Sequence, residues 1–376
     1  MQFKPNKAAI WIDKQDALEA SLPALAAGPF LAVDTESNSL YAYQEQVCLI
    51  QCSTNDDDYL IDGLAALDLA GLGDIFADEK VQKIFHAAEY DVICLRRDYG
   101  FTFNNLFDTM QAARILGFQQ LGLSAMLEGQ FRLEPVKSFQ KANWGKRPLS
   151  GEMKQYARVD THYLIALREK LAVQLEKNGL MALAEEDFRR LSVSENNQHD
   201  LSSYTQVRGY HKLSPRELAV LDALCEYRDQ KAKQMDRPLF KVIGSRALLA
   251  IAQAMPDSPA GLAQVNDLPP RLAARYEKGL LAAVKKGKQA PPIVPEKHKR
   301  PSNAYLNRLD DLKEWRKREG KKMGVPSDII LPRDILEEIA GEHPHTMVGL
   351  EAMMAEVPWR YRHFGQAIMD VISKGS

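Results

Sequence analysis

The stretch Phe30-Leu31-Ala32-Val33-Asp34-Thr35-Glu36 constrains this chain more than any other, because an apolar run leads directly into two carboxylates. Four consecutive apolar residues, bounded by Gly28-Pro29 and by Ser37-Asn38-Ser39, predict a buried strand. Side chains two apart on a strand lie on one face, so Asp34 and Glu36 should converge where this strand ends. Carboxylates held this close repel each other, and a divalent cation relieves that repulsion. A solvated loop is the competing interpretation.

A second acidic position lies in the helix predicted for residues 86–98. Val92 and Leu95 form one face of this helix, and Asp91 lies about 100° away, where it could reach the edge of a sheet. An acidic residue in the first turns of a helix is more often only a complement to the helix dipole. The residues themselves leave both interpretations of Asp91 open.

A third signal lies near the start of a long helix predicted from Ser150 to about Glu176. Tyr156 and Asp160 are four residues apart, so one side chain lies above the other on the same helical face. A phenol above a carboxylate suits a site in which the carboxylate holds a metal and the hydroxyl holds a water. A half-buried tyrosine beside a surface aspartate is the alternative.

The rest of the N-terminal half predicts a mixed α/β domain. Strands are expected at residues 47–52, 59–61, 81–85 and 101–107, and helices at residues 64–76 and 108–116, with Asp108 as the N-cap of the last helix. The run Asp56-Asp57-Asp58 predicts a turn rather than a metal cluster, because consecutive side chains on a tight turn point in different directions.

Composition limits the class of protein. The chain has 376 residues, 45% of them hydrophobic and 26% charged, which indicates two or three globular domains. Its four cysteines lack the spacing of a disulfide framework or a zinc site. No run approaches the ~18 apolar residues of a membrane span, and the N-terminus has no signal-peptide core, so the sequence predicts a cytoplasmic protein.

The net charge of −1 conceals an asymmetry. Residues 1–205 contain 20 Lys and Arg against 29 Asp and Glu, whereas residues 206–376 contain 29 against 21. This distribution is typical of a metal-dependent part joined to a part that tolerates phosphate backbones, although many basic helical domains bind nothing.

The C-terminal half predicts only helices, between linkers expected at residues 192–203 and 285–301. Its first helix should begin with Ser214 as N-cap, Pro215 as the first helical residue and Glu217 completing a capping box.

The helical half also repeats. Residues 321–326 parallel residues 234–238, and residues 331–336 parallel residues 243–248. The sequence therefore predicts two related helical bundles of about 70–80 residues each.

Taken in this order, the acidic motifs resemble those of the DEDDy 3′–5′ exonucleases, in which four acidic groups bind two divalent metals in an α/β, ribonuclease H-like (DnaQ-like) fold. The matching positions are Asp34, Glu36, Asp91, Asp160 and Tyr156. The resemblance runs from about Ala9 to Phe188 and includes three further motifs, Leu49-Ile50-Gln51, Phe107-Asp108-Thr109 and Trp144-x-x-Arg147-Pro148-Leu149. One departure is Asn143-Trp144-Gly145, where the family often has Asp-Trp-Ser.

The resemblance implies a role for each residue. Asp34 would bridge the two metals, Glu36 and Asp160 would hold the metal that activates water, and Asp91 would support the second metal. Tyr156 would orient the attacking water. Carboxylate ligands favour two Mg²⁺ or Mn²⁺ ions over zinc.

Both helical bundles resemble HRDC domains, and the arrangement as a whole resembles the ribonuclease D family. It implies an exonuclease domain at residues 1–192 and two small all-α HRDC-like domains at residues 206–288 and 302–376. The implied activity is hydrolysis of RNA from its 3′ end with release of nucleoside 5′-monophosphates. The expected partners are tRNA precursors or other structured RNAs with a 3′ tail.

Two alternatives stay open in the sequence. One is a DNA-directed or mixed-specificity 3′–5′ exonuclease, because no motif shows how a 2′-hydroxyl would be recognised. The other is a catalytically silent RNA-binding scaffold, which the presence of all four acids and the tyrosine disfavours. Candidate RNA contacts, each of which could equally be a solvated helix face, are Arg208, Lys212, Lys241, Arg246, Arg316, Lys317, Arg318, Lys321 and Lys322.

Overall fold

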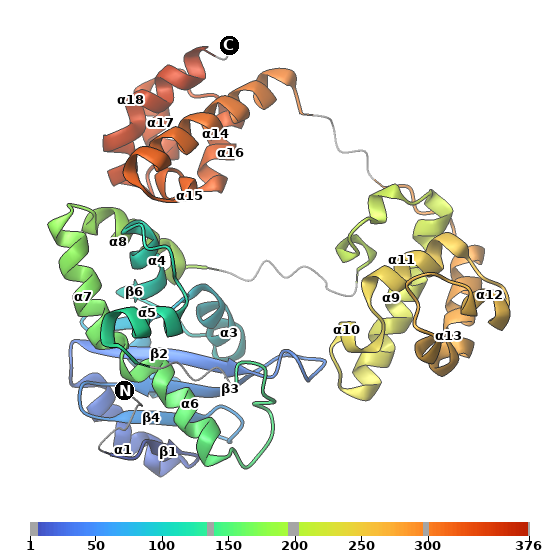
Figure 1. The fold of residues 1–376 in the computed structure, drawn as a ribbon, viewed down its shortest axis with the longest axis horizontal. Helices are drawn as coiled ribbons and strands as arrows, with labels where there is room; N and C mark the ends of the chain where they lie inside the picture. The colour runs from blue at the N-terminus through green and yellow to red at the C-terminus, as the bar shows by residue number, and fades with distance from the viewer. Residues whose placement is uncertain (1–6, 134–138, 195–202, 296–300, 375–376) are drawn as a thin grey trace. The chain divides into compact units, whose positions relative to one another are not determined.

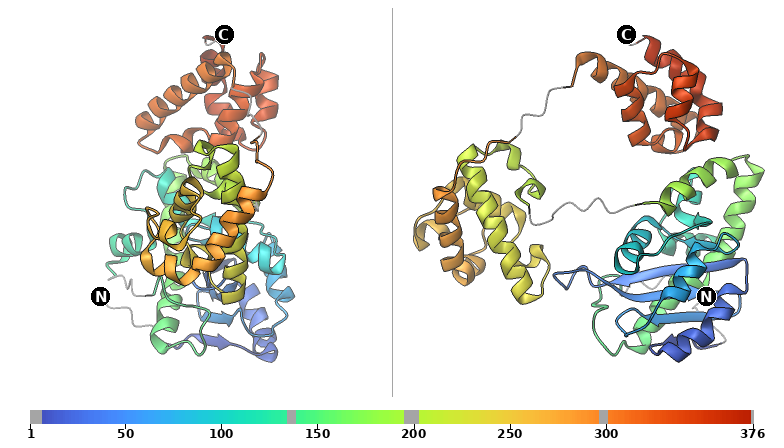
Figure 2. Two further views of the ribbon diagram at one scale, coloured as in Figure 1. Left: turned by 90° about the vertical axis from the view of Figure 1, so that its right-hand side faces the viewer. Right: turned by 180° about the vertical axis from the view of Figure 1, so that it is seen from behind.

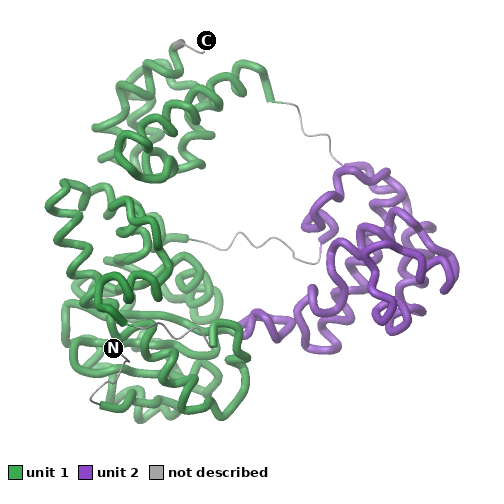
Figure 3. The backbone as a smooth tube through the Cα atoms, in the orientation of Figure 1, with its two compact units in different colours: residues 1–37, 47–195, 300–376 green, residues 38–46, 196–299 purple. Residues whose placement is uncertain are grey.

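The computed structural model describes residues 7–133, 139–194, 203–295 and 301–374. The chain divides into two compact units, shown in Figure 3. The first consists of residues 1–37, 47–195 and 300–376, and the second of residues 38–46 and 196–299. Each unit therefore combines segments that are far apart in the sequence.

A six-stranded mixed sheet in the order β1-β4-β3-β2-β5-β6 forms the centre of the first unit (Figure 1). Its strands are β1 (Ile10–Ile12), β2 (Phe30–Ser37), β3 (Val47–Ser53), β4 (Asp58–Asp62), β5 (Gln82–Phe85) and β6 (Leu106–Asp108). The central strand β2 pairs antiparallel with β3 and parallel with β5. Its apolar residues Leu31, Ala32 and Val33 are completely buried, as the sequence predicts.

Eight helices of the described chain accompany the sheet (Figures 1 and 2). They are α1 (Gln15–Ala26), α2 (Ala70–Ala77), α3 (Glu89–Tyr99), α4 (Thr109–Ile115), α5 (Leu123–Phe131), α6 (Gly151–His162), α7 (Leu164–Lys177) and α8 (Met181–Ser192). Helix α6 packs on β2, β3 and β4, whereas α7 packs on β2 and β5.

Several expected elements differ in their bounds, among them the strand expected at residues 101–107, of which only Leu106–Asp108 is a strand. Strand β2 continues to Ser37, so Asp34 and Glu36 lie within the strand rather than after it. The helix expected at residues 64–76 begins only at Ala70. The single helix expected from Ser150 to Glu176 is two helices, which meet at Tyr163 where the chain turns from the β3–β4 side of the sheet toward β5.

The helix expected at residues 86–98 begins at Glu89, because residues before it form a turn around the Asp108 carboxylate. The backbone N–H groups of Ala87 and Ala88 donate to Asp108 at 3.3 and 2.6 Å, and Ala87 has a φ of 66°. The same carboxylate accepts from the N–H of Gln111 at 2.8 Å, which confirms its predicted role as the N-cap of α4. One aspartate thus fixes the beginnings of two helices.

The second unit contains the first helical bundle, with the helices α9 (Pro215–Met235), α10 (Leu239–Val242), α11 (Ser245–Ala254), α12 (Pro259–Ala263) and α13 (Pro270–Gln289). Two short 3₁₀ turns precede it, at Tyr204–Gln206 and Tyr210–Lys212. The predicted capping box of Ser214 and Glu217 is present. Helix α13 is longer than expected and occupies the start of the predicted second linker; residues 195–202 and 296–300 of the linkers lie outside the described residues.

Residues 38–46, the connection between β2 and β3, belong to the second unit. The Tyr43 hydroxyl donates to Asp229 at 2.5 Å, and the Tyr43 N–H donates to Asp236 at 3.0 Å. Lys233 lies 2.9 Å from the Asp229 carboxylate and completes this cluster. Helix α9 therefore binds a segment that comes from the connection between β2 and β3.

The second helical bundle has the same order of elements and belongs to the first unit: α14 (Asn303–Met323), α15 (Ser327–Ile330), α16 (Arg333–Glu342), α17 (Met347–Met353) and α18 (Pro358–Lys374). The predicted repeat is confirmed in detail. Pro238 and Pro326 precede the second helix of their bundles with identical backbone angles, φ −56° and ψ 145°. No helix in the described part of the chain is long and apolar enough to cross a membrane.

A buried ion-pair cluster joins the second bundle to α8. The Arg360 side chain is completely buried, its Nη1 donates to the Glu186 carboxylate at 2.9 Å, and its Nη2 lies 2.8 Å from the Asp187 carboxylate. The same Glu186 accepts from the backbone N–H of Trp359, which itself belongs to the hydrophobic core around the sheet. The second bundle, α14 to α18, is thus packed on the α/β part of the first unit.

Replacement of Arg360 by Ala should therefore lower the free energy of unfolding of this unit by about 3–5 kcal/mol, because two carboxylates would lose their buried cation. Urea denaturation followed by tryptophan fluorescence measures this change. The control is Arg362→Ala, which alters an exposed arginine on the same helix. Equal losses for the two variants would contradict a stabilising role for the buried cluster.

Candidate active site

Three carboxylates from two elements meet on one face of the sheet. Asp34 and Glu36 lie two apart on β2, and Asp160 comes from α6, which crosses that strand. One oxygen atom from each lies within 4.8 Å of the others, which makes the group able to hold a metal ion. The two-residue spacing predicts that Asp34 and Glu36 share a face of the strand, and the family resemblance implies that Asp160 joins them.

Helix α6 is fixed in this position by polar contacts on either side of Asp160. Arg158 donates through Nε to Asp58 of β4, and both side chains are buried. The Thr161 hydroxyl lies 2.7 Å from the hydroxyl of Ser53 on β3. Because Asp160 lies between these two contacts, its carboxylate is held over β2.

Asp91 of α3 lies beside the three carboxylates but is not one of the group within 4.8 Å. Its side chain is buried, and the Thr35 hydroxyl donates to it. Thr35 lies between Asp34 and Glu36 on β2, so one strand contributes two acids and also positions a third. The helix-dipole interpretation of Asp91 does not explain this contact.

Burial and mutual repulsion raise the pKa of every acid in the cluster. Burial first, and then the Asp160 carboxylate, raise the pKa of Asp34 well above its ordinary value. Burial followed by Asp34 raises the pKa of Glu36 to about 10. The pKa of Asp160 rises to about 7 through burial and then Asp91, and that of Asp91 rises through burial and then Asp34.

None of these four carboxylates forms an ion pair with Lys or Arg in the described part of the chain. Oxygen ligands, net negative charge and the lack of a protein cation are the properties of a site for a hard divalent metal. The residues present therefore fit the divalent cation that a DnaQ-like fold implies.

The Tyr156 ring packs against two aromatic side chains beside the cluster. Its centroid lies 6.1 Å from the Trp144 ring and 5.8 Å from the Phe139 ring. Burial, and then the charge of Asp160, raise the pKa of the Tyr156 hydroxyl above its ordinary value. The hydroxyl thus keeps its proton and can donate a hydrogen bond.

The loop that supplies Trp144 is fixed by Arg147. Its guanidinium donates to the carboxylate of Asp62 on β4, to the Cys48 carbonyl at 2.6 Å and to the Trp144 carbonyl at 2.7 Å. At the departure from the family pattern, the Asn143 side chain accepts from the Gly145 N–H at 3.1 Å and closes a local turn. The Trp-x-x-Arg motif is therefore structural support for the Tyr156 side of the site.

Gln51 was not singled out as a site residue from the sequence. It lies opposite Asp34 in the register of β2 with β3, so both side chains lie on the same face of the sheet. It is completely buried, and neither atom of its amide has a hydrogen-bond partner among the described residues. A glutamine within the apolar strand Val47–Ser53 was the signal that could have identified it.

The fold and the crowded carboxylates define an exonuclease-type domain, and the family comparisons agree. A 3′–5′ exonuclease model matches residues 9–176, and an HRDC domain model matches residues 217–284 and 306–372. Over those residues the chain is similar to these two families, with a mixed α/β exonuclease domain first and a helical HRDC region after it.

Known proteins are similar to the chain over much of its length. It is 33% identical to Protein RRP6-like 1 of Arabidopsis thaliana over 65% of the chain and 41% of that protein. It is 30% identical to human exosome complex component 10 over 64% of the chain and 28% of that protein. The chain thus spans less than half the length of these relatives. The catalytic core of RRP6 from Trypanosoma brucei superposes with a TM-score of 0.65 at 27% identity, covering 75% of this chain and 80% of that one.

The structure of Escherichia coli RNase D, described as an exoribonuclease involved in structured RNA processing, matches over 98% of this chain and 99% of its own, with a TM-score of 0.73. At 24% identity this match shows a shared fold. That fold includes both helical bundles, so the predicted fold class is confirmed.

The electrostatics of the site predict how Asp34→Asn affects stability. Without metal, the variant should have a higher midpoint of thermal unfolding than the wild type, because one of the mutually repelling carboxylates becomes neutral. Mn²⁺ at 100 times its Kd should stabilise the wild type by about 2.7 kcal/mol and so raise its unfolding midpoint. The unfolding midpoint of the variant should rise much less.

Differential scanning fluorimetry in EDTA and along a Mn²⁺ titration measures both effects. Asp56→Asn, the same substitution at an exposed turn, is the control. An identical Mn²⁺ response in wild type and Asp34→Asn would exclude Asp34 as a metal ligand.

Proposed function

We propose that the chain is a two-metal 3′–5′ exoribonuclease that releases nucleoside 5′-monophosphates from RNA 3′ ends. The observation that supports this most strongly is the group of Asp34, Glu36 and Asp160 oxygens within 4.8 Å, with Asp91 beside it. Four carboxylates without a protein cation suit phosphodiester hydrolysis, in which charge on the phosphoryl group must be balanced.

Asp34, Glu36, Asp91 and Asp160 would hold the divalent cations, Mg²⁺ or Mn²⁺. When bound, such ions stabilise charge on the phosphoryl and leaving oxygens and increase the acidity of water. Asp34 shares a metal-sized group with Glu36 and Asp160 and is followed by Thr35, whose hydroxyl holds Asp91, so it is the candidate for the bridging ligand.

The Tyr156 hydroxyl would orient the attacking water. It remains protonated beside Asp160, so it donates a hydrogen bond instead of accepting the proton. The surrounding aromatic rings of Trp144 and Phe139 keep the phenol in place and exclude bulk solvent from one side of it.

RNA as the substrate is supported by the relatives, which include RNase D and RRP6 proteins. Within that class we propose structured RNAs with an unpaired 3′ tail, such as tRNA precursors, acted on in the cytoplasm. We also propose the domain bounds 1–192, 206–288 and 302–376. Three of the candidate RNA contacts already have partners inside the protein: Arg316 donates to the Leu331 carbonyl, Lys241 lies over the Tyr41 ring, and Lys322 donates to Glu319 at 2.7 Å.

The test is a time course on a 5′-labelled RNA hairpin with an unpaired 3′ tail, beside a DNA strand of the same sequence, in Mg²⁺ and in chelator. A metal-dependent ladder that shortens from the 3′ end of RNA alone is expected. Shortening of both strands would replace the proposal with a mixed-specificity exonuclease. Binding without shortening would indicate an RNA-binding scaffold.

Two substitutions separate the roles within the site. Asp34→Asn should lower kcat by more than about 10³-fold, because the bound cations supply most of the charge stabilisation. Tyr156→Phe should lower kcat by about 10²-fold with an unchanged Mn²⁺ response in thermal unfolding, because the ring packing is retained and only the hydroxyl is lost. Near-normal turnover by Asp34→Asn would show that the acids are not the catalytic centre.

A further inference from the structure

A glutamine with an unpaired amide lies on the face of the sheet that carries Asp34 and Glu36. Gln51 is completely buried in β3, and neither its amide nitrogen nor its amide oxygen has a hydrogen-bond partner among the described residues. Of the Asn and Gln side chains in that part of the chain, it is the only one with buried, unpaired amide atoms. Neither the packing of β3 nor the carboxylates described above account for this amide.

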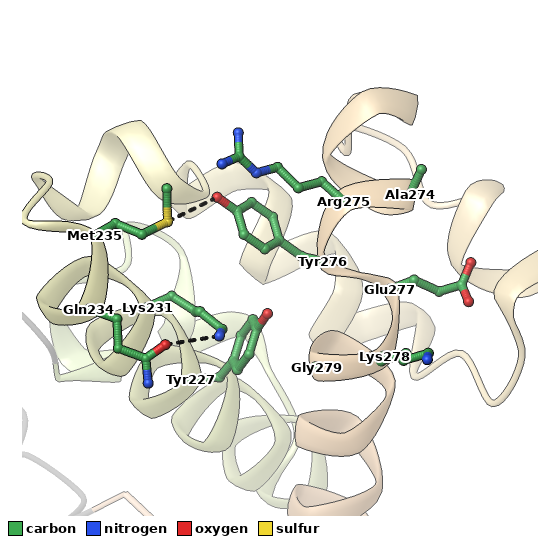
Figure 4. Close-up of a pocket in the computed structure, with 10 residues that line it drawn as sticks. All are labelled: Tyr227, Lys231, Gln234, Met235, Ala274, Arg275, Tyr276, Glu277, Lys278 and Gly279. Carbon is green, nitrogen blue, oxygen red and sulfur yellow. Dashed lines mark hydrogen bonds between the residues drawn. The ribbon is translucent and has the colours of Figure 1, made fainter.

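Such a group is rare, because buried polar atoms in folded proteins nearly always have partners. A cavity of about 600 Å³ between α9 and α13 in the first bundle provides a comparison (Figure 4). There the Lys231 ammonium donates to the Gln234 amide oxygen at 2.9 Å, and the Tyr276 hydroxyl donates to the Met235 sulfur at 3.6 Å. These polar groups are paired within the protein, whereas the Gln51 amide is not.

The unpaired amide lowers the stability of the folded chain. Burial removes its hydrogen bonds with water, and the described residues return none. The neighbouring residues Leu49, Ile50 and Cys52 fill the same strand with buried apolar side chains. An apolar side chain of similar volume at position 51 would occupy the space without this cost. A partner that is present only in the loaded site would account for the amide.

The strand register places this amide beside one particular acid. Gln51 pairs directly with Asp34 in the antiparallel register of β2 and β3, whereas Glu36 is opposite Leu49. Directly opposite residues have Cβ atoms about 4.5–5.5 Å apart and point to the same face. Because the amide of a glutamine extends well beyond its Cβ, its nitrogen can reach the carboxylate of the residue opposite.

Helix α6 covers this position. Two residues after Gln51, and therefore on the same face of β3, the Ser53 hydroxyl lies 2.7 Å from the Thr161 hydroxyl of α6. Two residues before it, Leu49 belongs to the same hydrophobic cluster as Ala157 of α6. Gln51 thus lies beneath the turn of α6 that contributes an acid to the site. The amide is enclosed between this turn and the sheet.

Asp34 has no side-chain hydrogen-bond donor among the described residues, unlike two acids nearby. Asp91 accepts from the Thr35 hydroxyl, and Asp58 accepts from the Ser53 hydroxyl at 2.6 Å. The donor to the Asp34 carboxylate is the Thr35 backbone N–H. Carboxylates that bind metal are usually oriented by hydrogen bonds from neighbouring side chains. The amide nitrogen opposite Asp34 can supply this hydrogen bond.

We propose that Gln51 is a positioning residue of the metal site, whose amide nitrogen donates a hydrogen bond to the Asp34 carboxylate when that carboxylate holds a divalent cation. The hydrogen bond fixes the orientation of the carboxylate, and the loaded site gives the buried amide its partner. Gln51 therefore lowers the stability of the metal-free chain and strengthens metal binding. The inference rests on the proposed function, since it takes Asp34 as a metal ligand.

The experiment compares the full-length wild type with Gln51→Met, which keeps the length of the side chain and removes both amide atoms. Differential scanning fluorimetry in EDTA measures the midpoint of thermal unfolding, which should rise by about 2–4 °C because an unpaired buried group is lost. The electron paramagnetic resonance signal of free Mn²⁺ gives the Kd for Mn²⁺, which should rise about 10- to 100-fold. A glutamine that only packs in the core would leave this Kd unchanged.

A crystal structure of the Mn²⁺-loaded chain tests the partner of the amide. The Gln51 amide nitrogen should lie within about 3.2 Å of an Asp34 carboxylate oxygen. An amide that turns to another group in the loaded site would overturn the proposal.

The control is Ile50→Leu, which alters the neighbouring residue on the other face of β3 and should change the Kd for Mn²⁺ by less than about twofold. If the wild type binds Mn²⁺ and hydrolyses RNA, a Gln51→Met variant with the Kd of the control would overturn the Gln51 proposal alone. A Gln51→Met midpoint below that of the wild type in EDTA would do the same, because the amide would then stabilise the metal-free fold. A wild type that neither binds Mn²⁺ nor hydrolyses RNA would overturn the proposed function as well.

Discussion

Repulsion among buried carboxylates is the constraint on which the rest of the catalytic domain depends. Asp34 and Glu36 occupy the central strand, and α3 and α6 bring Asp91 and Asp160 against it. When the chain folds without a counter-ion, these four carboxylates are buried close together at a cost in free energy. The apolar core and the contacts that hold α6 must outweigh that cost. A divalent cation converts the same crowding into a binding site.

The other aspartates of the sheet show how the protein separates structural acids from site acids. Asp58 and Asp62 on β4 are paired with Arg158 and Arg147. Hydrogen bonds outweigh burial and lower the pKa of both, chiefly from His162, Ser53 and Arg158 at Asp58 and from Arg147 at Asp62. The acids of the site have no such partner and their pKa values rise. Arg158 and Arg147 thus pair with the structural aspartates of β4, and the carboxylates of the site are left to bind metal.

The two helical bundles show one scaffold used in two ways. Both place a long first helix against a long last helix, with a proline before the short second helix. Each bundle has its own hydrophobic core, and Trp359 and Arg360 in addition fix the second bundle to the α/β part of the first unit. The two bundles have similar core residues, so the residues outside these cores decide whether a bundle packs on the α/β part.

Local patterns in the sequence determined much of this protein. The apolar run before Asp34 determined a buried strand, the four-residue spacing placed Tyr156 above Asp160, and Ser214 with Glu217 determined the first turn of α9, because each depends on neighbours within one or two turns of chain. Contacts between distant segments were decided only by the tertiary structure. Three such contacts are the Thr35 hydroxyl on Asp91, the buried amide of Gln51 opposite Asp34, and the attachment of Arg360 in the second bundle to α8. They join positions with no shared periodicity, so no local pattern could predict them.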